Sequence, residues 1–89
     1  MWGQRHLRYI RQHKKVFYTN LLTSGKLQSH LADIEEQAQE LFDRLMKQWA
    51  EREGITEKLK AENQMEWVGR MNALRSAVTE TVNAEVIFV

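Results

Sequence analysis

The sequence predicts an all-α protein, with two short N-terminal helices plus a long antiparallel helical hairpin that dimerises into a bundle. Apolar residues recur at spacings of three and four over most of the chain, which is the period of an amphipathic helix. Proline is absent, and two of the four glycines stand where this periodicity stops. The 89 residues are enough for one small domain, so residues 1–89 are interpreted as a single unit. Within it, residues 1–26 form a basic short-helix segment and residues 27–89 form the hairpin.

The two short helices are predicted from local spacing and from one glycine. The first spans Gln4–His13, where Leu7 and Ile10 mark a narrow apolar side and basic side chains fall opposite. The second is expected from about Lys15 to Ser24, because Gly25 can adopt the left-handed conformation that ends a helix.

The next segment has the most regular pattern in the chain and predicts an amphipathic helix about seven turns long. Its apolar residues alternate spacings of three and four: Leu27, Leu31, Ile34, Ala38, Leu41, Leu45 and Trp49. Gly54 ends this helix, and Thr56 can cap the next one, with Glu57 in its first turn. The short connection predicts that the two long helices fold back on each other.

From Thr56 onward nothing in the pattern stops a helix, so a second long helix of roughly 30 residues, about 45 Å, is expected. Met65 and Val68 lie beside its main apolar stripe, so this helix needs cover from the short helices or from a second chain. Residues 86–89 are all apolar, and we expect them to be buried against a partner. Met65, Val68 and Phe88 are therefore the predicted partner interface of a homodimer.

The near-zero net charge of +1 conceals a strong partition along the chain. Residues 1–26 contain six basic residues and no acid, whereas residues 27–89 contain seven basic residues and all 12 acids. A basic end of this kind can bind phosphates, and it can equally dock on the acidic body of its own chain or of a second copy.

Phosphate binding would place the first helix on duplex DNA. Lys and Arg contacts release counterions, so such binding is steeply dependent on salt, and Arg and Gln can also read base edges. The predicted nucleic-acid contacts are Gln4, Arg5, Arg8, Arg11, Gln12, Lys14 and Lys15.

Several function classes are disfavoured by what the sequence lacks. Without cysteine there is no disulfide, Cys-ligated zinc site or thiol nucleophile. His6 and His13 have no third ligand in a local motif, so we expect histidines that cap, pack or face solvent, with no metal and no cofactor. No convergent catalytic set is present, so we expect neither an enzyme nor a small-molecule substrate. No apolar stretch approaches the roughly 20 residues of a membrane helix, so a cytoplasmic protein without membrane contact is expected.

Four runs of residues are informative in combination: Trp2–Tyr9, Leu21–Leu27, Leu31–Ile34, and Ala61–Val68 followed by Arg70–Asn72. In this order and spacing they resemble the TnpV family of transposon-encoded proteins over nearly the whole chain. The resemblance implies a small protein of bacterial mobile elements, often encoded beside a large serine recombinase, whose molecular role is not established. It transfers no catalytic or binding residues. Family members usually carry an acidic, proline-containing extension before the position of Trp2, so the resemblance also implies a shortened form.

Two hypotheses follow from these observations. The first is a DNA-binding accessory protein, excisionase-like or regulatory, whose basic helix contacts phosphates while the hairpin dimerises. The second is a protein-interaction module that binds the recombinase or another protein through the apolar surface of the long helices, with no DNA contact.

Overall fold

The computed structural model describes residues 1–89 as helices joined by short turns. In chain order the elements are α1 (Trp2–His13), α2 (Lys15–Thr23), α3 (Leu27–Arg52), α4 (Glu57–Glu62), α5 (Gln64–Val82) and the π-helical turn η1 (Asn83–Ile87). The predicted all-α class is confirmed. The first helix begins at Trp2, two residues earlier than predicted.

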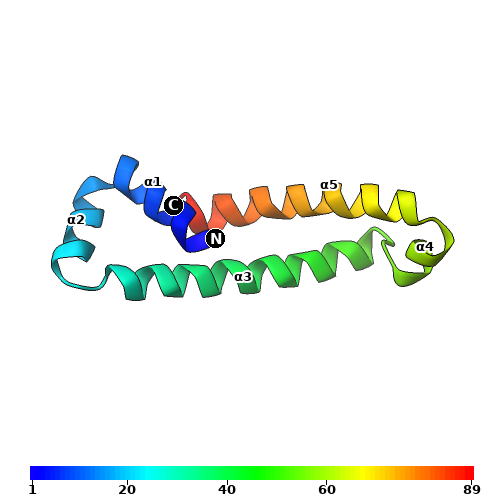
Figure 1. Cartoon of the computed structure of the whole chain (residues 1–89), viewed down its shortest axis with the longest axis horizontal. Helices are drawn as coiled ribbons and strands as arrows, with labels where there is room; N and C mark the ends of the chain where they lie inside the picture. Colours follow the sequence, from blue (N-terminus) through cyan, green and yellow to red (C-terminus); the bar gives the residue numbers. More distant parts are fainter.

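The helices form an elongated molecule, and α3 runs along most of its length (Figure 1). Helix α5 runs antiparallel to α3 along one half, and α1 packs on the other half, so the predicted hairpin is confirmed. The short helices α2 and α4 lie at the two ends. The molecule measures 55 × 19 × 17 Å, and the chain termini lie close together where α1 and η1 meet.

The turns before α3 and α4 follow the glycine prediction. Gly25 and Gly54 have φ values of 73° and 71°, the left-handed conformation that a residue without a Cβ adopts at little cost. After each glycine the next N–H closes the helix end, from Lys26 to the Leu21 carbonyl at 3.0 Å and from Ile55 to the Ala50 carbonyl at 2.9 Å. These are Schellman-type caps, and they fold the chain back sharply.

The prediction of a single long helix after Thr56 is wrong, because the helix is interrupted at Asn63. Its backbone dihedrals, φ −149° and ψ 85°, leave the helical region between α4 and α5. The Asn63 side chain accepts a hydrogen bond from the Glu66 N–H at 3.1 Å and so caps α5. A short polar side chain offers the backbone this alternative to a continuous helix.

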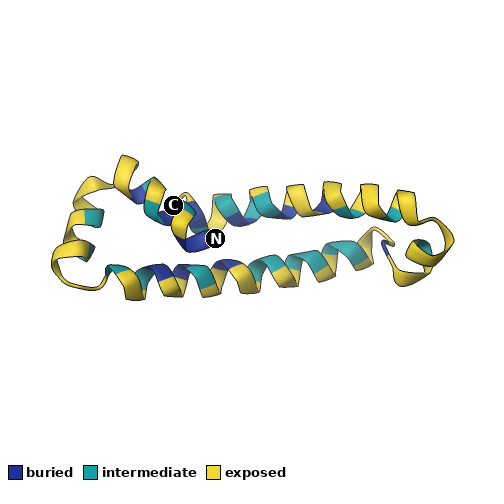
Figure 2. Cartoon of the chain, in the orientation of Figure 1, coloured by how far each residue is buried: buried dark blue, intermediate teal, exposed yellow.

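The core is thin and follows the inner sides of α3, α5 and α1 (Figure 2). Only 12 of 89 residues are buried, which leaves many apolar side chains of the hairpin half-covered. The main buried cluster consists of Trp2, Ile34, Ala38, Ile55, Leu74, Val78, Val82 and Ile87. Half-buried residues packed against it include Leu41, Phe42, Leu45, Met46, Trp49, Ala50, Trp67 and Met71.

Helix α1 is fastened to α3 at its first turn. The Trp2 ring is fully buried, lies 5.7 Å from the Phe42 ring between centroids, and donates its indole N–H to the Gln39 Oε1 at 3.1 Å. Glu35 accepts hydrogen bonds from the Gly3 N–H and from the amino terminus. A carboxylate of α3 therefore satisfies the free N–H groups at the start of α1.

Candidate nucleic-acid interface

Helix α1 has a clear division between a docked face and an outward face. Trp2, His6 and Ile10, spaced four residues apart, are buried against the rest of the chain. The side chains on the outward face are exposed and include Gln4, Arg8, Arg11 and Gln12. Four of the seven predicted nucleic-acid contacts thus share one solvent-facing surface.

The positive charge of this end is not neutralised within the chain. The ion pairs of the whole chain are those of the amino terminus with Glu35, of Lys58 with Glu62, and of Arg70 with Glu66. None of them involves the six cations of residues 1–26, although Asp and Glu make up 12 residues of the sequence. The Lys and Arg side chains of residues 1–26 therefore form no ion pair within the chain, and the terminal amino group is the one positive charge of this segment that pairs with a carboxylate.

Two of these cations are held by uncharged partners. The Arg5 guanidinium lies 5.1 Å from the Trp2 ring centroid and donates to Asn83 Oδ1 at 3.3 Å. The Arg11 guanidinium lies 5.4 Å from the centroid of the Tyr18 ring. Stacking on an aromatic face fixes a guanidinium while leaving its charge available to an anion.

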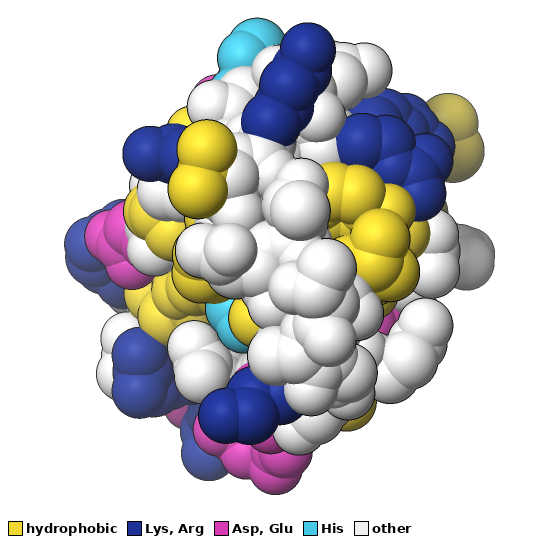
Figure 3. Space-filling model, turned by 90° about the vertical axis from the view of Figure 1, so that its left-hand side faces the viewer, with side chains coloured by type: hydrophobic (Ala, Val, Ile, Leu, Met, Phe, Trp, Pro, Cys, Tyr) yellow, Lys and Arg dark blue, Asp and Glu magenta, His cyan; other side chains and the backbone are white.

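Lys14 and Lys15 do not continue the outward face of α1. Lys14 has φ −131° and ψ 57°, so it is the break between the helices, and Lys15 begins α2. Helix α2 has no buried residue, and its Val16 and Leu22 are 76% and 53% exposed. Figure 3 looks onto this end and shows Lys and Arg side chains around uncharged surface and apolar patches, with Asp and Glu side chains beside some of them at the edges of the view.

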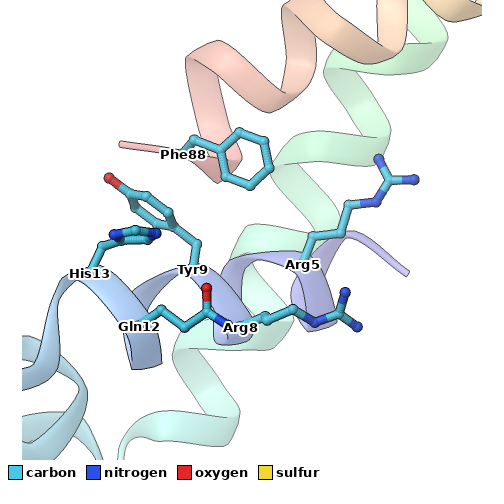
Figure 4. A pocket seen from close by; sticks show the side chains of 6 residues that line it. All are labelled: Arg5, Arg8, Tyr9, Gln12, His13 and Phe88. Carbon is cyan, nitrogen blue, oxygen red and sulfur yellow. The ribbon is translucent and has the colours of Figure 1, made fainter.

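A small pocket of about 160 Å³ opens beside α1 (Figure 4). Its lining residues are Arg5, Arg8, Tyr9, Gln12, His13 and Phe88. Phe88 comes from the C-terminal end, and its ring centroid lies 5.5 Å from that of Tyr9 at an angle of 56°. The structure therefore joins three predicted nucleic-acid contacts to Phe88, which the sequence placed in a partner interface.

The sequence interpretation missed Tyr9 and His13 as members of this pocket. They follow Arg8 and Gln12 directly and stand four residues apart, which places them beside each other on the helix. That spacing is a signal that could have found them. No local pattern predicts the contribution of Phe88, because it stands 79 positions after Tyr9.

Two histidines connect α1 to the rest of the molecule. His6 Nδ1 lies 2.8 Å from the Ile87 carbonyl oxygen, and His6 Nε2 lies 2.9 Å from His30 Nε2. Burial lowers the pKa of His30, the charge of His6 lowers it further, and Asp33 partly opposes both effects. No group of three or more His, Cys, Asp or Glu side chains is arranged to hold a metal ion.

The predicted partner interface is divided by the structure. Met65 and Val68 are 84% and 41% exposed on α5, at a distance from the basic end along the rod. Ile87 is fully buried in the core of its own chain, so the expectation that the whole 86–89 tail is covered by a partner is wrong at this residue. None of the helices combines the length and the apolar character required to cross a membrane.

Comparison with known proteins identifies the family. The family model described as transposon-encoded protein TnpV matches residues 1–87. No curated protein and no solved structure matches the chain. The chain belongs to the TnpV family of transposon-encoded proteins.

Proposed function

We propose that this TnpV-family protein is a non-catalytic DNA-binding factor in the recombination of its mobile element, acting in an excisionase-like or regulatory role. The observation that supports the proposal is the set of six cations in residues 1–26, none of which pairs with a carboxylate. An uncompensated positive surface attracts polyanions and releases counterions when it binds them.

The shape of this end is compatible with backbone contact. Helix α1 is 12 residues long, about 18 Å, and presents Arg8 and Arg11 away from the core. Because Trp2 and Tyr18 fix the guanidinium groups of Arg5 and Arg11, less side-chain entropy is lost when they meet phosphates. Contacts of this kind fix position on the duplex and contribute little sequence preference.

Fluorescence anisotropy with a labelled duplex, over about 50 to 200 mM salt, tests the proposal. We expect the double variant Arg8→Gln/Arg11→Gln to bind more weakly, with a salt slope shallower by about two units. Neither side chain is buried, so the fold should be retained. The matched control is Lys47→Gln/Arg75→Gln, which removes the same charge from exposed positions on α3 and α5. Equal losses in both double variants, or no binding at low salt, would refute DNA contact through α1.

A second candidate function, protein interaction, is favoured by the exposed apolar side chains on α5. Met65 and Val68 lie far from the basic end, and the chain leaves Met65 almost uncovered and Val68 partly exposed. We propose that this surface pairs two copies of the protein, and the element's serine recombinase is the alternative occupant. If DNA binding fails while this surface captures the recombinase, the protein-interaction function takes precedence.

A further inference from the structure

We propose that the pocket between α1 and the C-terminal end receives an unpaired nucleobase, so that the protein prefers single-stranded or locally opened DNA to intact duplex. The inference rests on the proposed function and deepens it, because it names the form of DNA that this site takes.

The first support is an aromatic surface exposed to solvent. Phe88 is 49% exposed and Tyr9 is half-buried, with their rings in tilted contact at the pocket (Figure 4). Bases stack on aromatic side chains regardless of sequence, because each base has a π face. In intact duplex these faces are covered by neighbouring bases, so only an unstacked base can use the site.

The second support is the set of polar groups around these rings. Arg8 forms no ion pair, and Arg5 is oriented by Asn83 and Trp2 while its remaining N–H groups are free. Figure 4 shows both guanidinium groups extending to one side, away from the two rings, where they suit a phosphate on the chain that leads from a stacked base. The amide of Gln12 adds a donor and an acceptor that can meet a base edge.

The size of the pocket limits what it can hold. Its volume of about 160 Å³ is well below the roughly 300–1,000 Å³ of sites for whole small molecules and cofactors. A single ring is a suitable occupant, with the attached sugar and phosphates lying outside along α1.

The aromatic surface is also held in place before any ligand arrives. The Phe88 N–H donates to the Asn83 carbonyl at 2.8 Å. The preceding residue, Ile87, is fully buried, and its carbonyl oxygen accepts a hydrogen bond from His6 Nδ1. The backbone that carries the ring is therefore held by the rest of the chain, and the ring itself contacts Tyr9. Fixing a contact side chain in this way reduces the entropy lost on binding.

The test compares a labelled 12-nucleotide oligothymidine with a duplex of the same length, using anisotropy at one low salt concentration. We expect the single strand to bind more tightly, and Phe88→Leu to weaken that binding about fivefold or more while leaving duplex binding unchanged. Phe88→Trp keeps a stacking surface and should retain the affinity. The matched control is Phe17→Leu, which alters a half-exposed aromatic residue on α2 outside this pocket.

Three results would overturn the inference. The first is an equal affinity for both forms of DNA together with no effect of Phe88→Leu. In that case the proposed binding of duplex DNA would still stand. Another is an equal loss in Phe17→Leu, because it would show a general apolar effect. The third is the absence of binding to any DNA, which refutes the proposed function as well. Circular dichroism of each variant verifies that the helices are retained.

Discussion

His6 and His30 show how a single pair of side chains ties three segments together. The Ile87 carbonyl can only accept, so His6 Nδ1 carries the proton of their 2.8 Å hydrogen bond. His6 Nε2 is then free to accept from His30 Nε2–H at 2.9 Å. A proton added at His30 Nδ1 leaves this hydrogen bond intact, whereas two protonated rings would place like charges on nitrogens 2.9 Å apart.

The histidine pair predicts that the folded state weakens in mild acid. Because the pKa of His30 is lowered in the folded chain, the unfolded chain binds more protons as the pH falls below about 6.5. The free energy of unfolding should therefore fall between about pH 7.5 and pH 5.5. Chemical denaturation at both pH values measures it, and His30→Gln, which retains a donor for His6, should flatten the dependence.

The exposed residue His13 supplies the matched control. His13→Gln should keep the pH dependence of the wild type, because this ring is not buried between helices. The pKa of Glu35 is also lowered, first by the Gly3 N–H and further by the amino terminus, so its contribution is lost only in more acidic solution, below about 4.5. A wild type that is equally stable at both pH values would contradict the role given to His30.

Helical periodicity could predict the placement of His6 but not its partners. It stands midway between Trp2 and Ile10 on the docked face, so the spacing alone puts it in the core. His30 and Ile87 are 24 and 81 positions away, and these contacts depend on how the helices pack. For the same reason the sequence does not predict that Phe88 joins the pocket, although the cations of α1 that line it were predictable from the charge pattern.

At the scale of elements, the break at Asn63 is the main departure from the sequence prediction. The apolar stripe of α5 begins at Trp67, and the positions one turn earlier, Asn63 and Gln64, are polar, but no glycine or proline there marks an interruption. The signal present was a capping pattern, with Asn63 accepting from the Glu66 N–H and donating to the Glu66 carboxylate at 3.3 Å. The Gly25 and Gly54 turns were predictable, because their conformation is set locally.

The cap at Asn63 should contribute measurably to stability. We expect Asn63→Ala to lower the free energy of unfolding by about 1 kcal/mol, because the N–H groups at the start of α5 lose their acceptor. Asn63→Asp keeps the acceptor and should stay near the wild type. The control, Asn72→Ala, lies on an exposed part of α5 and should be neutral or slightly stabilising. If Asn63→Ala is as stable as the wild type in urea denaturation, the break does not depend on this cap.

At the scale of the whole molecule, the chain is too elongated to bury its apolar surface alone. A compact domain of 89 residues has a radius of gyration of about 12 Å, whereas this chain has 16.8 Å. Over the half next to α4, α3 and α5 face each other with only the short helix α4 at their end, which leaves Trp49, Trp67 and Met71 half-buried. Two helices cannot enclose a core, so this half is where a second copy would stabilise the fold most.

Helix geometry predicts that the poorly covered apolar side chains of α3 and α5 lie on one side of the hairpin. Phe42 and Met46 lie on one flank of the core stripe of α3, and Val68 and Met65 lie on the corresponding flank of α5. Because both helices are right-handed and run antiparallel, these flanks point to the same side. A second copy docked there would cover residues from both helices in one contact, giving a self-complementary interface.

The proposed dimer gives the last prediction. We expect Val68→Glu to raise the dimer dissociation constant by about thirtyfold or more, because an unpaired carboxylate would be buried at the centre of the interface. Sedimentation equilibrium over a concentration series measures this. The control Ala73→Glu adds the same charge to α5 on a face turned away from that flank, so it should dimerise as the wild type does. A wild type that stays monomeric throughout, or a Val68→Glu variant that dimerises normally, would show that this flank does not pair two copies. The half-buried side of the hairpin would then be left for a different protein to cover.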